Sequence, residues 1–333
     1  MSRLRVVVIG GGRNGEHEVS LASAAAVARA LDPRRYDVVP LTIDRAGDWR
    51  GADGEALGLR RAIDEVRACD LVIPVVHGRH GEDGTLAALC ELAGTRYVGS
   101  GVTAGAIGMD KHLTKLVANS VGVPTARGVL LRRENAHAYR FREPVVVKPV
   151  TAGSSLGVTL VHAASELPGA IDAALAFDDR VLVEQVVVGR EIDIAVVRRA
   201  DGSMLVSPAL EIEHDGLFDH EAKYDGRAVF HVPARLDVGE RWELERAAVR
   251  LYDALDCAGL VRLDFFLTAD GPVLNEVNTT PGLTAESQVP RMFRAAGVSY
   301  PQLLDLLVDD ALAGPPPGPV AAGLSAQRAI LSA

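Results

Sequence analysis

The most informative polar residues lie in segment 261–282, which contains two β-like runs. The runs flank residues 269–271, Ala-Asp-Gly, a sequence typical of a three-residue hairpin loop with glycine in the left-handed position. Pairing the two runs about this loop places Asp264 directly opposite Glu276. Two opposed carboxylates repel each other unless a positive charge lies between them. The hairpin therefore predicts a site for a cation.

That cation can be a divalent metal ion. The same pairing places Arg262 opposite Asn278 on the face that carries both acids, and Asn275 on the other face, because side chains alternate along a strand. Carboxylate and amide oxygens suit Mg²⁺ or Mn²⁺, and Mg²⁺ favours one or two protein carboxylates together with substrate phosphates. The alternative is a surface hairpin in which Arg262 neutralises the acids. We favour a metal site formed by Asp264, Glu276 and Asn278, because this face carries more polar groups than a salt bridge needs.

Two residues of the same segment could stabilise negative charge on a reacting carbonyl oxygen. Arg262 would sit beside Asp264, and removing a positioned donor of this kind costs about 3 kcal/mol of transition-state stabilisation. Gly282 has no side chain, so its backbone N–H can approach a ligand closely. The segment thus predicts an oxyanion site next to the metal site.

A glycine- and serine-rich loop at 151–157 follows a β-like run that contains Lys148. Glycines let backbone N–H groups turn toward phosphate oxygens, and serine hydroxyls add donors. The loop is not a Walker A sequence, and taken alone it fits a plain hairpin turn equally well. Lys148 close to Ser154 and Ser155 favours phosphate binding.

The N-terminal glycines at 10–15 fit G-x-G-x-x-G between a predicted strand and a predicted helix, a pattern typical of dinucleotide binding. A ribose-binding acid is expected about 20 residues further on, yet the second predicted strand ends at Asp44. Glu16 and Glu18 would also repel a phosphate. We interpret Glu16 as the partner of a cation such as a substrate ammonium, which leaves an NAD-dependent oxidoreductase as an alternative.

Two other patterns are relevant to binding. His77 follows a predicted strand directly, at the sheet edge where open α/β sheets bind ligands, and is a candidate for substrate binding. Only four of the 35 basic residues are lysine, and a compact ammonium is suited to phosphate. Of these, Lys115 is interpreted as a lysine retained by chance; the others are Lys111, Lys148 and Lys223.

The elements expected around these residues indicate several domains. The first hundred residues alternate strand and helix, the last of these strands at 96–98, which predicts a parallel sheet wrapped by helices. Later segments predict a small α+β unit, then long strands and a helix at 238–256 with one apolar face. The predicted division is 1–105, 106–184 and 185–313, followed by a flexible tail at 314–333.

Composition limits the class of protein. The chain has 333 residues, 48% hydrophobic and 24% charged, which is typical of globular proteins. A net charge of −9 disfavours nucleic acid and anionic membranes as partners. No apolar run approaches the roughly 18 residues of a membrane span, so a cytoplasmic location is expected. The three cysteines, Cys69, Cys90 and Cys257, share no metal-ligand spacing and are expected to be apolar packing residues.

Together the motifs resemble those of the D-alanine–D-alanine ligases, a family of the ATP-grasp superfamily. The similarity covers about residues 4–312. The matching motifs, in chain order, are G-G-R-N-G-E-H-E-V-S-L, H-G-R-H-G-E-D-G, M-D-K, V-K-P-V-T-A-G-S-S-L-G, E-A-K-Y, R-L-D-F-F and N-E-V-N-T-T-P-G-L-T. The resemblance implies a mixed α/β and α+β fold, in which an N-terminal Rossmann-like pre-ATP-grasp domain precedes a two-domain ATP-grasp unit.

The resemblance also implies roles for single residues in nucleotide binding. Lys111, Lys148 and Lys223 match phosphate contacts, Glu184 matches the adenine contact and Glu191 the ribose contact. The family binds two Mg²⁺ ions per site, at positions that match the three residues of the hairpin site.

Substrate positions follow in the same way. Glu16, Ser154 and Tyr224 match a hydrogen-bonded trio that positions the first D-alanine. Ser287 matches the residue that holds the second substrate's carboxylate. Gln288 departs from the family pattern, which usually has an apolar residue there, and so leaves D-serine or another small D-amino acid as an alternative second substrate.

The implied reaction joins two D-alanines at the expense of ATP through a D-alanyl phosphate, for peptidoglycan precursor synthesis. A loop at 215–230 is expected to exclude water from this intermediate. The resemblance further implies a homodimer. A non-catalytic sensor of nucleotide or D-amino acid is a further alternative, which the complete set of acids, lysines and Arg262 disfavours.

Overall fold

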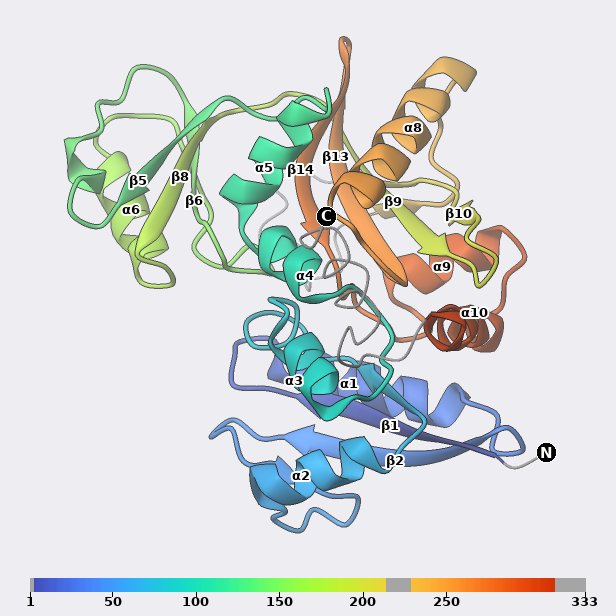
Figure 1. Cartoon of the computed structure of the whole chain (residues 1–333). Helices are drawn as coiled ribbons and strands as arrows, with labels where there is room; N and C mark the ends of the chain where they lie inside the picture. The colour runs from blue at the N-terminus through green and yellow to red at the C-terminus, as the bar shows by residue number, and fades with distance from the viewer. Residues whose placement is uncertain (1–2, 214–228, 315–333) are drawn as a thin grey trace, which may run out of the picture.

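A computed structural model describes residues 3–213 and 229–314 of the chain. Three sheets with their helices organise these residues (Figure 1). Among the described residues, no helix is long and apolar enough to cross a membrane.

The N-terminal sheet has the strand order β3-β2-β1-β4, and its central strand β1 pairs in parallel with both neighbours. Its elements are β1 (Leu4–Gly11), α1 (His17–Ala30), β2 (Tyr36–Ile43), β3 (Trp49–Arg50), α2 (Gly58–Arg67), β4 (Leu71–Pro74) and α3 (Thr85–Ala93). The run Val6 to Ile9 is buried, as expected for a strand covered on both faces. The predicted parallel sheet is confirmed.

One predicted strand of this unit is wrong. The segment 96–98 forms a single parallel bridge between Tyr97 and Val72. Two backbone hydrogen bonds join the segment to Val72, and the chain then turns away at Gly99, whose φ of +111° lies in a region that L side chains rarely adopt.

The central sheet is antiparallel, with the order β5-β8-β6-β7. Its elements are β5 (Gly128–Arg132), η1 (Ala136–Ala138), β6 (Val145–Pro149), β7 (Thr159–Val161), α6 (Leu167–Leu175) and β8 (Arg180–Gln185). Helix α6 covers one face and shares a small apolar core with the strands. The other face is therefore available to line a site.

The C-terminal sheet has the order β12-β11-β9-β13-β14, with β10 also paired to β9. Its elements are β9 (Arg190–Arg198), β10 (Met204–Val206), β11 (Leu210–Glu213), β12 (Val229–His231), α8 (Val238–Ala254), β13 (Leu260–Thr268), β14 (Gly271–Asn278), α9 (Gln288–Ala295) and α10 (Tyr300–Ala313). A capping box formed by Asp237 and Glu240 begins α8. The predicted apolar face of that helix packs into the sheet's core.

Helix α5 (Lys111–Ser120) lies between the central sheet and β14, and α4 (Val102–Met109) precedes it on the side of the N-terminal unit (Figure 1). Ala104 and Ala118 of this pair belong to the core of the C-terminal sheet. Both helices contact β14, and α5 also contacts α8. Helix α4, which spans the predicted boundary between residues 105 and 106, therefore packs with the C-terminal sheet.

The predicted pairing of β13 with β14 is confirmed where the polar residues lie. Asp264 faces Glu276, and Arg262 faces Asn278. The predicted three-residue loop is wrong, because Thr268 pairs with Gly271 and only residues 269 and 270 form the loop. Between Asp264 and Phe265 the register shifts by one residue, which leaves Asn275 as the extra residue of a bulge and restores the predicted facing at Asp264. The prediction for Asn275 is therefore wrong: the bulge breaks the alternation of faces, and the side chain reaches Lys148 across the site.

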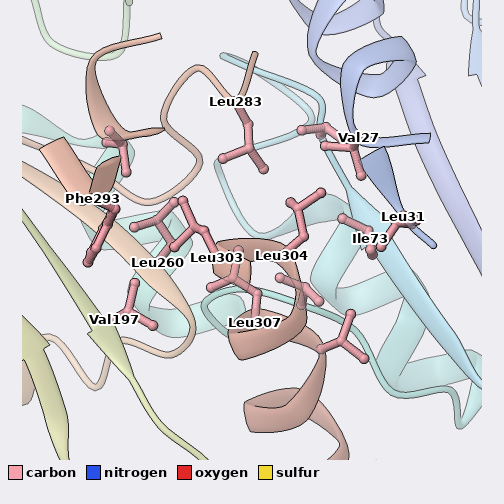
Figure 2. Close-up of a cluster of buried hydrophobic side chains, with 14 of the residues drawn as sticks. Val27, Leu31, Ile73, Val197, Leu260, Leu283, Phe293, Leu303, Leu304 and Leu307 are labelled. Carbon is pink, nitrogen blue, oxygen red and sulfur yellow. The ribbon is translucent and has the colours of Figure 1, made fainter. Parts of the chain in front are cut away.

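One hydrophobic core joins the N-terminal sheet to the C-terminal unit (Figure 2). Val27, Leu31 and Ile73 of the N-terminal unit meet Phe293 of α9 and Leu304 of α10. All five side chains are buried. Because both units bury apolar surface in one core, we expect them to keep a fixed relative orientation.

We expect Leu304→Ala to lower the free energy of unfolding by about 3 kcal/mol, since it opens a cavity in this shared core. Leu92→Ala is the matched control because Leu92 is 90% exposed on α3, and its effect is expected within about 0.5 kcal/mol. Urea denaturation measures both. Equal losses in the two variants would contradict the shared core.

Candidate functional site

A cavity of about 870 Å³ lies where the three sheets meet. Every predicted site residue that the structure describes lines this cavity: Glu16, His77, Lys111, Lys148, Ser154, Ser155, Glu184, Glu191, Arg262, Asp264, Glu276, Asn278, Gly282, Ser287 and Gln288. Lys223 and Tyr224 lie outside the described residues, as does most of the loop predicted at 215–230. Residues far apart in the sequence thus converge on one space.

The paired carboxylates of the hairpin are neutralised by cations. Arg262 makes two hydrogen bonds to Asp264, at 2.7 and 2.8 Å. Lys111 Nζ lies 3.2 Å from Glu276 Oε2. Burial alone would lower the pKa of Arg262, but the carboxylates of Asp264 and Asp193 outweigh it and raise that pKa above its usual value. Arg262 is therefore a permanent cation.

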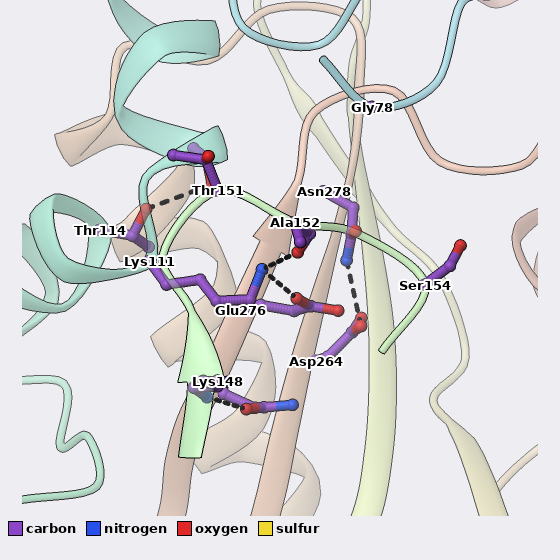
Figure 3. Close-up of polar contacts among 12 residues, drawn as sticks. Gly78, Lys111, Thr114, Lys148, Thr151, Ala152, Ser154, Asp264, Glu276 and Asn278 are labelled. Carbon is purple, nitrogen blue, oxygen red and sulfur yellow. Dashed lines mark hydrogen bonds and ion pairs between the residues drawn. The ribbon is translucent and has the colours of Figure 1, made fainter. Parts of the chain in front are cut away.

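The residues present suit a divalent ion that also binds a ligand. Within the described ranges, no group of three or more His, Cys, Asp or Glu could hold a metal. Asp264 and Glu276 supply two carboxylates, and the amide of Asn278 lies 3.0 Å from Asp264 (Figure 3). Two carboxylates and an amide leave coordination positions for phosphate oxygens, as Mg²⁺ prefers.

Two of the lysines expected to contact phosphate, Lys111 and Lys148, line the cavity. Lys111 also donates to a carbonyl of the glycine-rich loop, at 2.7 Å (Figure 3). Lys148 lies 2.7 Å from Glu184 and 3.2 Å from the amide oxygen of Asn275. The two lysines therefore connect helix α5, the central sheet and the bulged strand β14.

The interpretation of Lys115 as a lysine retained by chance is wrong. It lies one turn after Lys111 on α5, so both project from the same helix face. Its Nζ is 2.9 Å from Glu184 Oε1, and the side chain is buried. A third lysine thus belongs to the site because α5 packs its polar face against the central sheet.

The charges of this cluster are interdependent. Burial lowers the pKa of Lys115 to about 8, with repulsion from Lys148 adding to the effect and Glu184 opposing it. Burial would raise the pKa of Glu184, but Lys148 and Lys115 together hold it below its usual value. At neutral pH the carboxylate and the ammonium of Lys115 are both charged.

The contact between Glu16 and Ser154 joins the N-terminal unit to the glycine-rich loop. Ser154 Oγ donates to Glu16 Oε1 at 2.6 Å. Gly78 and Gly153 make room for this carboxylate, because a Cβ at either position would lie within 2.7 Å of Glu16 Oε2. Ser154 itself has a φ of +50°, a strained conformation for a residue other than glycine.

The loop that carries Gly282 is held by side chains of the N-terminal unit. His77 contacts the carbonyl of Thr280 through Nδ1 and Ser23 through Nε2, at 2.8 and 2.9 Å. Glu82 accepts from the backbone N–H of Thr280 at 3.2 Å. Burial raises the pKa of Glu82 to about 8, and Glu16 adds to the shift. Both ring nitrogens of His77 have protein partners, which favours positioning of this loop over direct substrate contact.

Ser287 caps helix α9 and Gln288 begins it, beside Gly282 and Arg262. Ser287 Oγ accepts from the backbone N–H of Thr284 at 3.0 Å, and a Cβ at Gly282 would lie 3.3 Å from the same oxygen. Gln288 accepts a hydrogen bond from Arg262 at 2.7 Å. Gln288 therefore helps to fix the guanidinium.

Four residues of the site have weak signals or none in the local sequence, for different reasons. For Lys115 the signal is its spacing of four residues from Lys111, which puts both lysines on one face of a helix. Glu82 lies within a motif that was recognised, although its own role was not. Asp193 faces Asp264 only because β9 pairs with β13, and Asn275 faces the site only because of the bulge, so neither had a local signal.

Comparison with known proteins identifies the family. The model described as "D-ala D-ala ligase C-terminus" matches residues 117–309. That described as "D-ala D-ala ligase N-terminus" matches residues 5–64 and 54–100. The chain belongs to the D-alanine–D-alanine ligase family. A D-alanine–D-alanine ligase of Mycolicibacterium vanbaalenii is 42% identical to this family member, over 94% of this chain and 98% of its own length.

Solved structures of the family agree in fold. The D-Ala:D-Ser ligase VanG from Enterococcus faecalis superposes with a TM-score of 0.83 at 34% identity, covering 93% of this chain and 100% of its own. The D-alanine–D-alanine ligase from Bacillus anthracis complexed with ATP has a TM-score of 0.77 at 27% identity, covering 93% and 97%. The predicted pre-ATP-grasp and ATP-grasp fold is confirmed.

The pKa of Lys115 leads to a pH-dependent stability. The folded-state value of about 8 lies below the ordinary 10.5, so the unfolded chain binds more protons between these pH values. Stability relative to a Lys115→Met variant should therefore rise with pH, by up to about 3 kcal/mol between pH 8 and 10.5. Urea denaturation of both proteins at several pH values measures it. A pH-independent difference would contradict the shift.

Proposed function

We propose that this protein ligates two D-alanines to D-alanyl-D-alanine, with ATP hydrolysed to ADP and phosphate, for peptidoglycan precursor synthesis. The observation that carries the proposal is the single cavity in which Asp264 and Glu276 face each other beside Arg262 and a cluster of lysines. Membership of the family supports the same reaction. A non-catalytic sensor would not require paired carboxylates, an arginine and several lysines in one cavity.

The nucleotide is proposed to bind between the central and C-terminal sheets. Lys111 and Lys148 are proposed to contact its phosphates, with Ser155 in the glycine-rich loop. Glu184 would accept from the adenine amine, and Glu191, on β9 opposite Phe266, would contact the ribose. Lys223 is proposed as a further phosphate contact from outside the described residues.

Asp264, Glu276 and Asn278 are proposed to hold two Mg²⁺ or Mn²⁺ ions together with the phosphates. When bound, such ions neutralise negative charge on a transferring phosphoryl group. The chain's own residues keep the acids in register through the strand pairing and hold Arg262 against Asp264. Arg262 remains next to the acids to act on the carbonyl.

The first step activates D-alanine. Glu16 is proposed to bind the substrate ammonium, and its hydrogen bond to Ser154 fixes its orientation. The substrate carboxylate then attacks the γ-phosphorus of ATP, which forms a D-alanyl phosphate and releases ADP. Tyr224 is proposed to complete this subsite from outside the described residues.

The second step forms the peptide bond. The neutral amine of the second D-alanine attacks the acyl carbon, and the C–O bond to phosphate breaks as the amide forms, with phosphate taking up the proton that the amine loses. Arg262 and the N–H of Gly282 are proposed to stabilise the tetrahedral oxyanion, and Ser287 to hold the second carboxylate. His77 positions the loop of Gly282 through Thr280.

The second substrate can be tested directly. Gln288 places an amide beside the second subsite, and VanG, a D-Ala:D-Ser ligase, is among the structural relatives. The experiment measures phosphate release from ATP when D-alanine is supplied together with each member of a panel of D-amino acids and D-lactate. Mass spectrometry identifies the products. D-alanyl-D-alanine as the main product is expected; no phosphate release with any pair would refute the ligase function.

Asp264→Asn and Glu276→Gln are each expected to reduce turnover at least 1000-fold, because each removes a charge that a divalent ion requires. Coupled ADP release measures the rate, and circular dichroism verifies the fold. A variant with near-normal ADP production would show that the hairpin does not bind the metal.

Glu16→Gln is expected to raise the KM for the first D-alanine at least tenfold, because a neutral amide replaces the partner of the substrate ammonium. Nucleotide binding should be preserved. Glu18→Gln is the matched control, since Glu18 lies nearby on α1 but its side chain is 71% exposed and pairs with Arg45. Equal D-alanine dependence in both variants would contradict the role of Glu16.

We further propose that the protein acts as a homodimer. Light scattering of the purified protein tests this assembly; a mass of 35.2 kDa at micromolar concentration would contradict it.

A further inference from the structure

The carboxylate of Glu184 is held between two buried ammonium groups. Lys148 contacts one oxygen at 2.7 Å and Lys115 the other at 2.9 Å. The side chains of Glu184, Lys148 and Lys115 are 4%, 6% and 7% exposed, so water does not screen these charges. One acid with two cations is more than neutrality requires.

The two lysines differ in what else they contact. Lys148 also donates to Asn275 on the strand that carries Glu276, and in the proposed function it contacts phosphate. Lys115 faces Glu184 as its nearby anion, while Lys148 and Lys111 repel it. If Lys148 exchanges Glu184 for a phosphate of the bound nucleotide, Lys115 is the cation that still contacts Glu184.

The consequence concerns the nucleobase. A buried carboxylate without a cation is destabilised and takes up a proton. A protonated carboxyl can donate as well as accept, whereas an ionised one only accepts. The edge of adenine presents an amine that donates, but guanine presents a carbonyl oxygen there. An acceptor-only Glu184 therefore favours adenine and repels guanine.

We propose that Lys115 is a positioning residue that holds Glu184 as an oriented, acceptor-only carboxylate and thereby sets the preference for adenine over guanine nucleotides. The proposal rests on the proposed function, in which Glu184 meets the nucleobase. Lys115 acts through Glu184 and contacts neither phosphate nor D-alanine.

The test compares binding of the β,γ-imido analogues of ATP and GTP, with Mg²⁺, to the full-length protein by calorimetry. Lys115→Met is expected to weaken binding of the ATP analogue about tenfold or more, the loss typical of a hydrogen bond to a charged group. Binding of the GTP analogue should change less than threefold. An unchanged ratio of the two affinities would overturn the proposal.

Arg250→Met is the matched control. Arg250 donates to the carbonyl of Val121 at the far end of α5, at 2.9 Å, and so supports the same helix without touching Glu184. It should leave both affinities within threefold. A loss of adenine preference in this variant would mean that loosening of α5, and not the charge of Lys115, causes the effect, which would refute the proposal.

A double-mutant cycle separates action through Glu184 from a direct role. Glu184→Gln is expected to reduce the preference for adenine, and adding Lys115→Met should then change it less than threefold. Independent, multiplicative losses would refute action through Glu184. Lys115→Arg keeps the cation and should retain the preference. If Lys115→Met does not fold, Lys115→Gln replaces it with the same expected loss.

Failure of the proposed function gives a different result. Binding of the analogues requires no D-alanine and no turnover, so adenine selectivity that depends on Lys115 would support the inference even if no dipeptide formed. An unmodified protein that forms D-alanyl-D-alanine but binds both analogues equally would overturn the inference and leave the proposed function intact.

Discussion

Repulsion between carboxylates on neighbouring strands is the constraint on which the rest of the site depends. Asp193, Asp264 and Glu276 lie at one level across β9, β13 and β14. No isolated sheet would tolerate this row. The protein offsets it with Arg262, whose guanidinium contacts two of the acids, and with Lys111 from a helix outside the sheet. Docking of α5 against the sheet therefore stabilises the third acid of the row.

That docking explains why the helix pair α4 and α5 shares the core of the C-terminal sheet. Asp110 caps α5 through the backbone N–H of Leu113 and also pairs with Arg180 of the central sheet at 2.7 Å. The helix is thus fixed to both sheets, and Lys111 at its first turn reaches the acids. The N-terminal unit has a similar role at the open end of the hairpin, where His77 and Glu82 hold the loop that follows β14.

Much of this arrangement could be predicted from the sequence, because its signals are local. A hairpin turning near residues 269–271 was predictable, but its loop has two residues and not three, and Asp264 faces Glu276 only because the bulge at Asn275 compensates for the shorter loop. The bulge at Asn275 was not predictable, since nothing in the alternation of the strand marks an extra residue. Asp193 requires knowledge of which strand pairs with β13, which is a long-range property. The spacing of four residues puts Lys115 on the same helix face as Lys111. That spacing does not show whether the face is exposed to solvent or buried in the site, because burial depends on how the helix packs.

The lysines and acids of the cavity are best understood as pairs that can exchange partners. In this structure Lys111 is paired with Glu276, Lys148 with Glu184 and Arg262 with Asp264. Nucleotide binding in the proposed function adds phosphates and divalent ions together, so the hairpin acids gain metal while Lys111 and Lys148 gain phosphate. Glu184 would be the one acid left without a new cation, since no metal is proposed beside it. A buried anion without a cation in that position costs several kcal/mol, and the contact with Lys115 offsets part of that cost before any ligand arrives. Lys115, which is proposed to contact no phosphate, therefore allows Lys148 to exchange its contact with Glu184 for a phosphate.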